Sequence, residues 1–154
     1  MNLSTIDRID EVGTAIMLSE SDYENALRQG EALHRDFRPH ISGDYVEYLR
    51  KMAVEGAGVF QLVHEGEVRA LAIWRAFLTT YSGRRMEVDD LVTTEGHRSK
   101  GYGATLIAGL EAKARSLSCH AVMLNSGTSR VDAHRFYLRE RYTIGAFQFI
   151  KRLN

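Results

Sequence analysis

Apolar side chains recur at helical spacing in the first third of the chain. Residues 19–37, "SESDYENALRQGEALHRDF", begin with the capping residues Ser and Asp, and residues 45–56, "YVEYLRKMAVEG", follow the cap Asp44. Each segment gathers its apolar and aromatic side chains on one face: Tyr23, Ala26, Leu27 and Leu33, then Tyr45, Tyr48, Leu49 and Met52. This spacing behind a cap is typical of amphipathic helices. We predict two helices here, preceded by a first strand in "TAIMLS", residues 14–19.

The rest of the chain mixes strand and helix periods. Residues 58–78, "GVFQLVHEGEVRALAIWRAFL", are two β-rich runs around "EGE", which predicts a hairpin, and "MEVDDLVTT" predicts the next strand. A helical stripe follows in "GATLIAGLEAKARSL", then a short strand in "HAVMLN", a helix in "SRVDAHRFYLRER" and a last strand in "YTIGAFQFIKRL". This order predicts a mixed α/β sandwich and one domain over residues 1–154.

Composition narrows the class of protein. The 154 residues are 44% hydrophobic and 26% charged, as in soluble globular proteins. Lys plus Arg equals Asp plus Glu at 20 each, which argues against a broad electrostatic grip on nucleic acid. One cysteine excludes an internal disulfide, the histidines lack metal-ligand spacing, and no window resembles a membrane span of ~20 apolar residues. We expect a cytoplasmic protein with no metal and with neither nucleic acid nor membrane as partner.

The stretch "HRSKGYGATL", residues 97–106, joins a predicted strand to a predicted helix. Unpaired backbone N–H groups give a helix start a partial positive charge, and glycines let an anion approach them closely. Arg98 and Lys100 add positive charge, so the simplest occupant is a phosphate or pyrophosphate. The Walker A loop and the dinucleotide fingerprint do not fit the spacing, whereas Arg-x-x-Gly-x-Gly does, with Gly101 and Gly103.

Two segments, "RSKGYGATLI" and "DAHRFYLRERYTIGAFQFIKRL", resemble the GNAT superfamily of acyl-CoA-dependent N-acetyltransferases. The resemblance implies a single-domain α/β fold, with a mixed, mostly antiparallel twisted sheet of six to seven strands flanked by about four helices. It also implies acetyl-CoA as co-substrate. Its pyrophosphate would lie on the loop Arg98, Ser99, Lys100, Gly101, Tyr102, Gly103 and Ala104. Its pantetheine arm would run along Leu91, Val92, Thr93 and Asn125, next to a splay between two strands.

Three positions depart from the family pattern. Arg130 stands where the family often has Asn, Arg141-Tyr142 replaces the usual Gly-Phe, and Glu95 occupies a common proline position. These changes affect loop geometry and the acceptor side more than the CoA loop.

Acetyl transfer to an amine requires a neutral amine, a stabilised oxyanion and a proton for the departing thiolate. Asp89 and Asp90 lie on the strand before the loop, where the family often has its acidic residue. Because neighbours in a strand point to opposite faces, we expect only one of them in the site, and a water is a third candidate for the base. Tyr137 matches the family's usual acid, and a phenol of pKa ~10 suits protonation of a thiolate.

The sequence therefore predicts transfer of an acetyl group from acetyl-CoA to a primary amine by direct attack in a ternary complex. The last segment is especially similar to that of aminoalkylphosphonate N-acetyltransferases, which favours a small-molecule amine. The alternatives are a protein or peptide N-acetyltransferase, and a non-catalytic acyl-CoA-binding regulatory module. A homodimer, the commonest symmetric assembly, is a possible state that the sequence does not decide.

Overall fold

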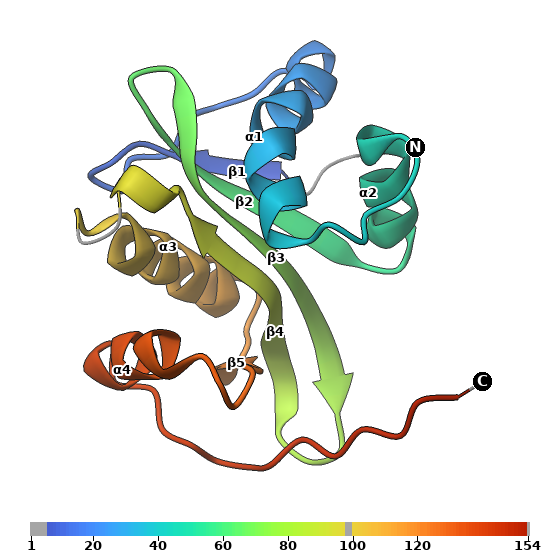
Figure 1. Cartoon of the computed structure of the whole chain (residues 1–154), viewed down its shortest axis with the longest axis vertical. Coiled ribbons are helices and arrows are strands. Elements are labelled where there is room, and N and C mark those ends of the chain that lie inside the picture. Colours follow the sequence, from blue (N-terminus) through green and yellow to red (C-terminus); the bar gives the residue numbers. More distant parts are fainter. Residues whose placement is uncertain (1–5, 98–99, 154) are drawn as a thin grey trace. The chain divides into compact units, whose positions relative to one another are not determined.

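A computed structural model of the chain describes residues 6–97 and 100–153 (Figure 1). The chain divides into two compact units, Met1–Met123 and Leu124–Asn154, which are described separately. The elements are β1 (Ile6–Ile9), η1 (Glu20–Asp22), α1 (Tyr23–Phe37), α2 (Tyr45–Val54), β2 (Ala57–His64), β3 (Glu67–Thr79), β4 (Gly83–Thr93), η2 (Glu95–His97), α3 (Tyr102–Ser116), β5 (Ala121–Leu124) and α4 (Val131–Arg139).

The sheet is mixed and keeps the order of the chain, β1-β2-β3-β4-β5. β1 pairs parallel with β2, whereas β2–β3 and β3–β4 are antiparallel hairpin partners. Glu65 and Gly66 make the β2–β3 turn with φ of 53° and 76°, and such a two-residue turn with both φ positive matches the twist of its strands. The predicted hairpin is thereby confirmed.

Helices cover both faces of this sheet (Figure 1). Gly30 of α1 lies against Gln61 and Leu71, where a Cβ would come within 2.8 Å and 2.9 Å of their side chains. Gly109 of α3 lies against Phe60, 2.9 Å from an added Cβ. Because consecutive residues of a strand face opposite ways, Phe60 and Gln61 show that α1 and α3 pack on opposite faces.

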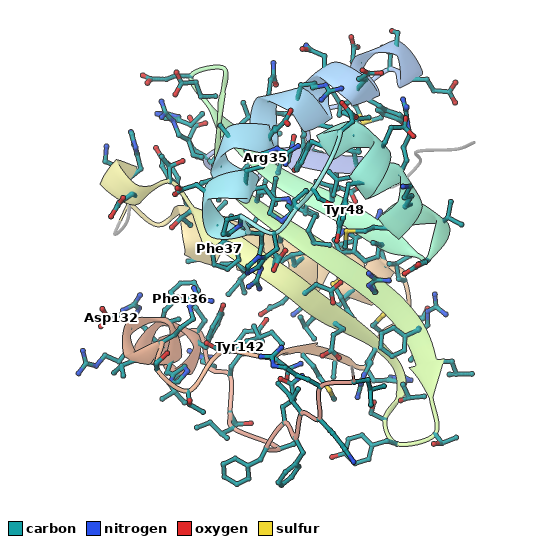
Figure 2. The ribbon with its side chains drawn as sticks, turned by 45° about the vertical axis from the view of Figure 1, so that its right-hand side comes forward. Arg35, Phe37, Tyr48, Asp132, Phe136 and Tyr142 are labelled. Carbon is teal, nitrogen blue, oxygen red and sulfur yellow. The ribbon has the colours of Figure 1, made fainter. Side chains whose placement is uncertain are left out.

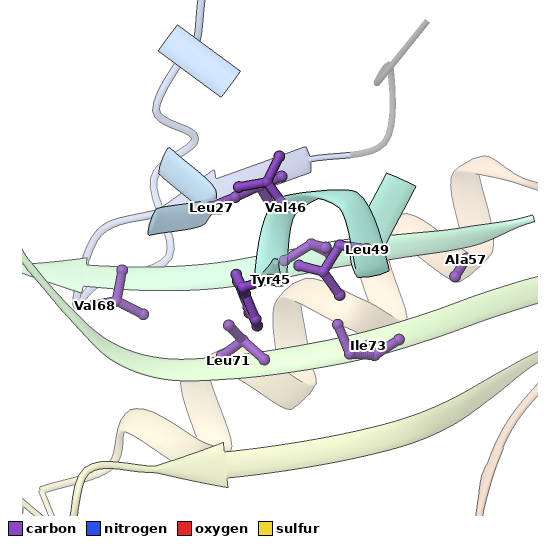
Figure 3. Close-up of a cluster of buried hydrophobic side chains, with 9 residues drawn as sticks. Leu27, Tyr45, Val46, Leu49, Ala57, Val68, Leu71 and Ile73 are labelled. Atoms are coloured by element: carbon purple, nitrogen blue, oxygen red, sulfur yellow. The ribbon is translucent and has the colours of Figure 1, made fainter. Parts of the chain in front are cut away.

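The core on the α1 and α2 face is built from both helices and the central strands (Figure 3). Leu27 of α1 and Tyr45 and Leu49 of α2 are buried against Leu71 and Ile73 of β3. Asp44 caps α2 as its sequence predicts, because its side chain accepts the Glu47 N–H at 3.0 Å. This packing fixes both helices over the middle of the sheet.

In the second unit, α4 ends at a left-handed residue. Arg141 has φ of 67°, and the Tyr142 N–H donates to the Tyr137 carbonyl at 2.9 Å. This is the helix-ending geometry that favours glycine, which explains why glycine is usual where this chain has Arg141. Residues 143–153 form neither helix nor strand.

The predicted helices and the strands from residue 58 to residue 125 are confirmed. The prediction of six to seven strands is wrong, because the sheet has five strands in the described ranges. The last predicted strand, residues 142–153, is not a strand in the described part of the chain, because alternation alone does not supply a pairing partner. The prediction of a first strand in "TAIMLS", residues 14–19, is wrong as well. Asp10 accepts the Val12 and Thr14 N–H groups and turns the chain there, so that the first strand comes earlier, at Ile6–Ile9.

None of the helices in the described ranges is long and apolar enough to cross a membrane. The prediction of one domain over residues 1–154 stays a prediction.

Candidate active site

The loop between β4 and α3 is anchored at its start by β3. Thr94 donates its backbone N–H and its hydroxyl to the Arg69 carbonyl, at 2.9 Å and 3.2 Å. The short helix η2 follows, and Gly101 then enters α3 with φ of 86°, a left-handed conformation that glycine adopts at least cost. Gly101 presents no side chain to the first N–H groups of α3, which leaves them for another acceptor. Two predicted loop residues, Arg98 and Ser99, lie outside the described residues.

Tyr102 fixes the position of this helix start. It lies between the glycines Gly101 and Gly103, and its ring is buried against two histidines. The ring centroids are 5.8 Å from His64, at the end of β2, and 6.2 Å from His97 of η2. The side chain of Tyr102 therefore holds the loop to the sheet, while the glycines on either side leave its backbone accessible.

Two cationic side chains, Arg69 and Lys100, act on His97 in the loop. Desolvation, and then the charges of Arg69 and Lys100, lower the pKa of His97 below its usual value. The part of this lowering that comes from Arg69 and Lys100 reflects a positive potential at His97, which Glu67 partly offsets. Such a potential at a helix start favours a phosphorylated ligand.

A β-bulge in β4 changes the directions of the two candidate carboxylates, Asp89 and Asp90. Asp90 pairs with Ile73 and Val88 pairs with Trp74, so Asp89 is the extra residue on β4. Both aspartates consequently find partners on the α1 and α2 face. The bulge interrupts the alternation from which opposite faces were expected, and which of the two enters the site stays a prediction.

Asp90 is held by two side chains of the first helical region. Its Oδ2 lies 2.9 Å from His34 Nε2, and its Oδ1 accepts Arg38 Nε at 2.6 Å. Burial would raise the pKa of Asp90, but the hydrogen bonds and charges of His34 and Arg38 outweigh it and lower that pKa. Asp90 is thus an ionised and firmly positioned carboxylate.

The network continues from Asp90 into α2. His34 is 1% exposed, and its Nδ1 lies 2.9 Å from the hydroxyl of Tyr45, which is 0% exposed. Because an ionised carboxylate can only accept, His34 Nε2 carries a proton and donates it to Asp90. Burial raises the pKa of Tyr45 well above its usual value, so the hydroxyl keeps its proton.

Asp89 has a different partner. Its Oδ2 accepts Arg75 Nε at 2.8 Å, and Arg75 also donates to the Glu55 carbonyl, just after α2, at 3.2 Å. The side chain of Asp89 is 31% exposed, against 12% for Asp90. Leu91, Val92 and Thr93 follow on β4 and pair with Ala72, Leu71 and Ala70 of β3.

The second unit carries the two remaining predicted residues. Tyr137 of α4 is buried, with ring centroids 5.3 Å from Phe136 and 6.0 Å from Tyr142, which Figure 2 labels on and just after the helix. Burial raises the pKa of the Tyr137 phenol, although the charge of Arg130 opposes this. Asn125 directly follows β5.

His34 and Arg38 are the functional candidates that sequence reasoning missed. One signal was available, since His34 continues the buried positions Leu27 and Gly30 along one face of α1. A histidine on a buried helix face needs polar partners. Among the described residues, no group of three His, Cys, Asp or Glu side chains is arranged to hold a metal ion.

The structure is a mixed α/β sheet whose fourth strand leads through a glycine-containing loop into α3. Residues 25–141 match the Acetyltransferase (GNAT) family. An uncharacterized N-acetyltransferase of Bacillus subtilis, YhdJ, is 34% identical over 113 residues, covering 70% of this chain and 80% of that protein. The chain belongs to the GNAT acetyltransferase family, whose members use acetyl-CoA, and is an N-acetyltransferase.

Two further relatives differ in what their names say they acetylate. The aminoalkylphosphonate N-acetyltransferase of Salmonella typhimurium is 39% identical over 67 residues, 44% of each chain. The ribosomal-protein-alanine N-acetyltransferase structure from Brucella melitensis has a TM-score of 0.72 at 18% identity, covering 84% of this chain and 94% of that one. The second likeness concerns the fold alone and confirms an α/β fold of this type.

We predict that replacing Asp90 makes the free energy of unfolding depend less on pH between pH 6 and 3. Its lowered pKa means that its contribution is present above the unfolded pKa of about 3.9 and is lost as pH falls through the folded pKa. Urea unfolding between pH 6 and 3 should show a smaller loss of free energy for Asp90→Asn than for wild type. Asp132→Asn, whose side chain is 98% exposed, controls for removal of a charge. Parallel profiles for wild type and Asp90→Asn would contradict the network.

We also predict that CoA raises the pKa of His97. A pyrophosphate beside the loop would place negative charge near His97, which opposes the part of the lowering that Arg69 and Lys100 cause. Histidine titration by NMR, with and without saturating CoA, measures the shift. Pantetheine, which has no phosphate, should leave it unchanged, and an equal response to both compounds would place the phosphates elsewhere.

Proposed function

We propose that this protein transfers the acetyl group of acetyl-CoA to the primary amine of a small molecule by direct attack in a ternary complex. The observation that carries the donor half is the start of α3, where Gly101 is left-handed and basic side chains create a positive potential. Backbone N–H groups from Gly101 to Ala104 would hold the pyrophosphate, with Arg98, Ser99 and Lys100 beside it. Leu91, Val92, Thr93 and Asn125 would line the pantetheine arm.

The geometry of Tyr45 favours direct transfer over an acetyl-enzyme intermediate. Hydrogen bonds join Tyr45 to His34 and His34 to Asp90, which is the arrangement of a nucleophile, its base and an orienting acid. However, Tyr45 is fully buried and its pKa is raised, so its oxygen is neither accessible nor easily ionised. The amine nitrogen itself therefore attacks the thioester carbonyl carbon.

The free energies of proton loss decide which group takes the proton of the amine. An ammonium group of pKa about 10 loses its proton to solvent at pH 7 at a cost of about 4 kcal/mol. Transfer to a carboxylate of ordinary pKa would cost about 8 kcal/mol, and the pKa of Asp90 is lower still. We therefore propose that the amine loses this proton to the buffered solvent, through water, before it attacks, and that Asp90 stays ionised.

Asp90 then serves to attract and orient the amine. Its Oδ1 is engaged by Arg38, whereas Oδ2, bonded to His34, retains one lone-pair direction. A single acceptor on a fixed carboxylate suits one N–H of the incoming amine or of its water. Asp89, more exposed and paired with Arg75, would contribute negative potential beside it.

Tyr137 is the proposed acid. As the tetrahedral intermediate collapses, the carbon–sulfur bond breaks and the CoA thiolate takes the phenolic proton. The nitrogen releases its surplus proton to solvent, and the phenolate of Tyr137 regains a proton from solvent. The raised pKa of Tyr137 keeps this proton in place across the physiological range. A small amine is favoured as acceptor by the 39% identity to an enzyme named for aminoalkylphosphonates. The rival reading, a protein or peptide acceptor, predicts turnover with peptides.

We predict that Gly101→Ala weakens acetyl-CoA binding while a matched glycine does not. Gly56 has φ of 87°, against 86° for Gly101, and neither position has described atoms within 4 Å of an added Cβ. Both alanine variants should lose about 1–2 kcal/mol of unfolding free energy through left-handed strain. Only Gly101→Ala should show a smaller rise in melting temperature with acetyl-CoA.

A second pair of variants tests the effect of an added negative charge at the same site. Gly103→Glu should abolish stabilisation by acetyl-CoA, because a carboxylate there repels the pyrophosphate yet suits a first helical turn. Ala108→Glu adds the same charge at an exposed position of α3 and should bind normally. Undiminished stabilisation of Gly103→Glu would overturn the loop assignment.

We predict that Tyr137→Phe lowers kcat about 100-fold, the usual contribution of a general acid, with acetyl-CoA affinity retained. Thiol release from acetyl-CoA measures turnover over a panel of aminoalkylphosphonates, polyamines, amino acids and peptides. Turnover with small amines supports the proposal, whereas turnover confined to peptides replaces it by protein acetylation. Full turnover of Tyr137→Phe would assign the acid to water or another group.

A further inference from the structure

Arg38 directly follows α1, and only one edge of its guanidinium is engaged within the first unit. Its Nε donates to Oδ1 of Asp90 at 2.6 Å, and its Nη2 lies 2.5 Å from the same oxygen. A guanidinium also has an outer edge, formed by Nη1 and Nη2, which presents two further N–H donors. Among the described residues of the first unit, Nη1 has no hydrogen-bond partner, and the side chain is 47% exposed. The outer edge of Arg38 is therefore left for a ligand.

The surroundings of Arg38 hold its guanidinium in place. Its N–H donates to the His34 carbonyl at 2.8 Å, and its carbonyl accepts the Ile41 N–H at 3.1 Å. Pro39 follows and disfavours a helical backbone at Arg38. The guanidinium carbon lies 4.4 Å from the ring centroid of Phe37, which Figure 2 labels at the end of α1. Because contacts within the protein fix this side chain, a ligand that binds it loses little affinity to side-chain entropy.

The charge of the Asp90–Arg38 ion pair limits which amines it suits. The pair is neutral as a whole, because the pKa of Asp90 is lowered and an arginine stays charged. An amine arrives at neutral pH mostly as an ammonium ion, which is repelled by the guanidinium beside the carboxylate. A ligand that also brings an acid group offers each charge of the pair its opposite. The pair therefore suits an amine that carries its own negative charge.

We propose that the outer edge of Arg38 binds an acid group of the acceptor, so that the acceptor is a compact amine bearing a carboxylate or phosphonate. This inference rests on the proposed acetyl transfer, in which Oδ2 of Asp90 orients the amine. Two oxygens of such an acid match two guanidinium N–H groups, and contacts of this bidentate kind are strong and directional. Because Oδ2 and the outer edge belong to one ion pair, the amine and the acid group are only a few bonds apart.

Calorimetry on the full chain saturated with CoA measures acceptor binding without turnover. The probes are β-alanine and aminoethylphosphonate, which carry an acid group a short carbon chain away from the amine, and β-alaninamide, in which an uncharged amide replaces the acid. At least one of the acids should bind about tenfold more tightly than the amide, the usual effect of hydrogen bonds between charged groups. Equal affinities for all three probes would overturn the proposal.

Variants of Arg38 separate direct binding of the acid from an effect through Asp90. Arg38→Gln should remove the preference for the acid over the amide, whereas a residue that only positions Asp90 would weaken all probes alike and leave that preference unchanged. Arg115→Gln removes the same charge from a side chain of α3 that is 73% exposed, and the preference should persist.

Arg38→Lys covers the case in which Arg38→Gln does not fold, because it keeps a positive charge beside Asp90. It should lower the preference for the acid about threefold or more, since a lysine ammonium lacks the planar two-donor edge. An unchanged preference in either variant of Arg38 would overturn the proposal.

Thiol release from acetyl-CoA with the same probes separates this inference from the proposed function. Turnover of the acids in preference to the amide, lost in Arg38→Gln, supports both. Equal turnover of acids and amide would keep acetyl transfer to small amines and overturn the role of Arg38. Binding of the acids that depends on Arg38, without turnover of any probe, would support the acid-binding edge and contradict transfer to these amines.

Discussion

The hydrogen bond between His34 and Asp90 is the interaction on which the geometry of the sheet's first helical face depends. At 2.9 Å it joins α1 to β4 across 56 residues of sequence, and the Tyr45 hydroxyl extends it into α2. A carboxylate that is 12% exposed cannot remain ionised without such partners. The bond therefore fixes two helices and one strand together, and it fixes a negative charge where they meet.

That charge gives two nearby positions at the carboxyl end of β4 complementary roles. Asp90 is held rigid by His34 and Arg38, whereas the loop a few residues later is positively charged around Lys100. An amine would be drawn to the first and a phosphorylated donor to the second. The strand thus separates the attractions for the two proposed substrates along one short piece of backbone.

Features set by local sequence could be predicted, and features set by pairing could not. The cap Asp44, the Glu65–Gly66 turn and the glycine-flanked loop each depend on neighbours within a few residues. The bulge at Asp89 depends on the register with β3, which periodicity does not contain. The same holds for the last segment, whose alternation is typical of a strand but says nothing of where a partner lies. The role of His34 escaped because its partner Asp90 is distant in sequence and the residues between them carry no sign of the contact.

The bulge on β4 also determines how this strand tolerates changes in length. Val88 faces α3 with Trp74, and Asp90 faces α1 with Ile73, so Asp89 is the surplus residue between two regular stretches. Removing it would leave an ordinary alternating strand in which Asp90 still meets His34 and Val92 still faces the core. Removing any residue from Asp90 to Thr93 would instead move the side chains that follow it on β4 to the opposite face of the sheet. Asp89 is therefore the one position at which β4 can become shorter and keep its two faces.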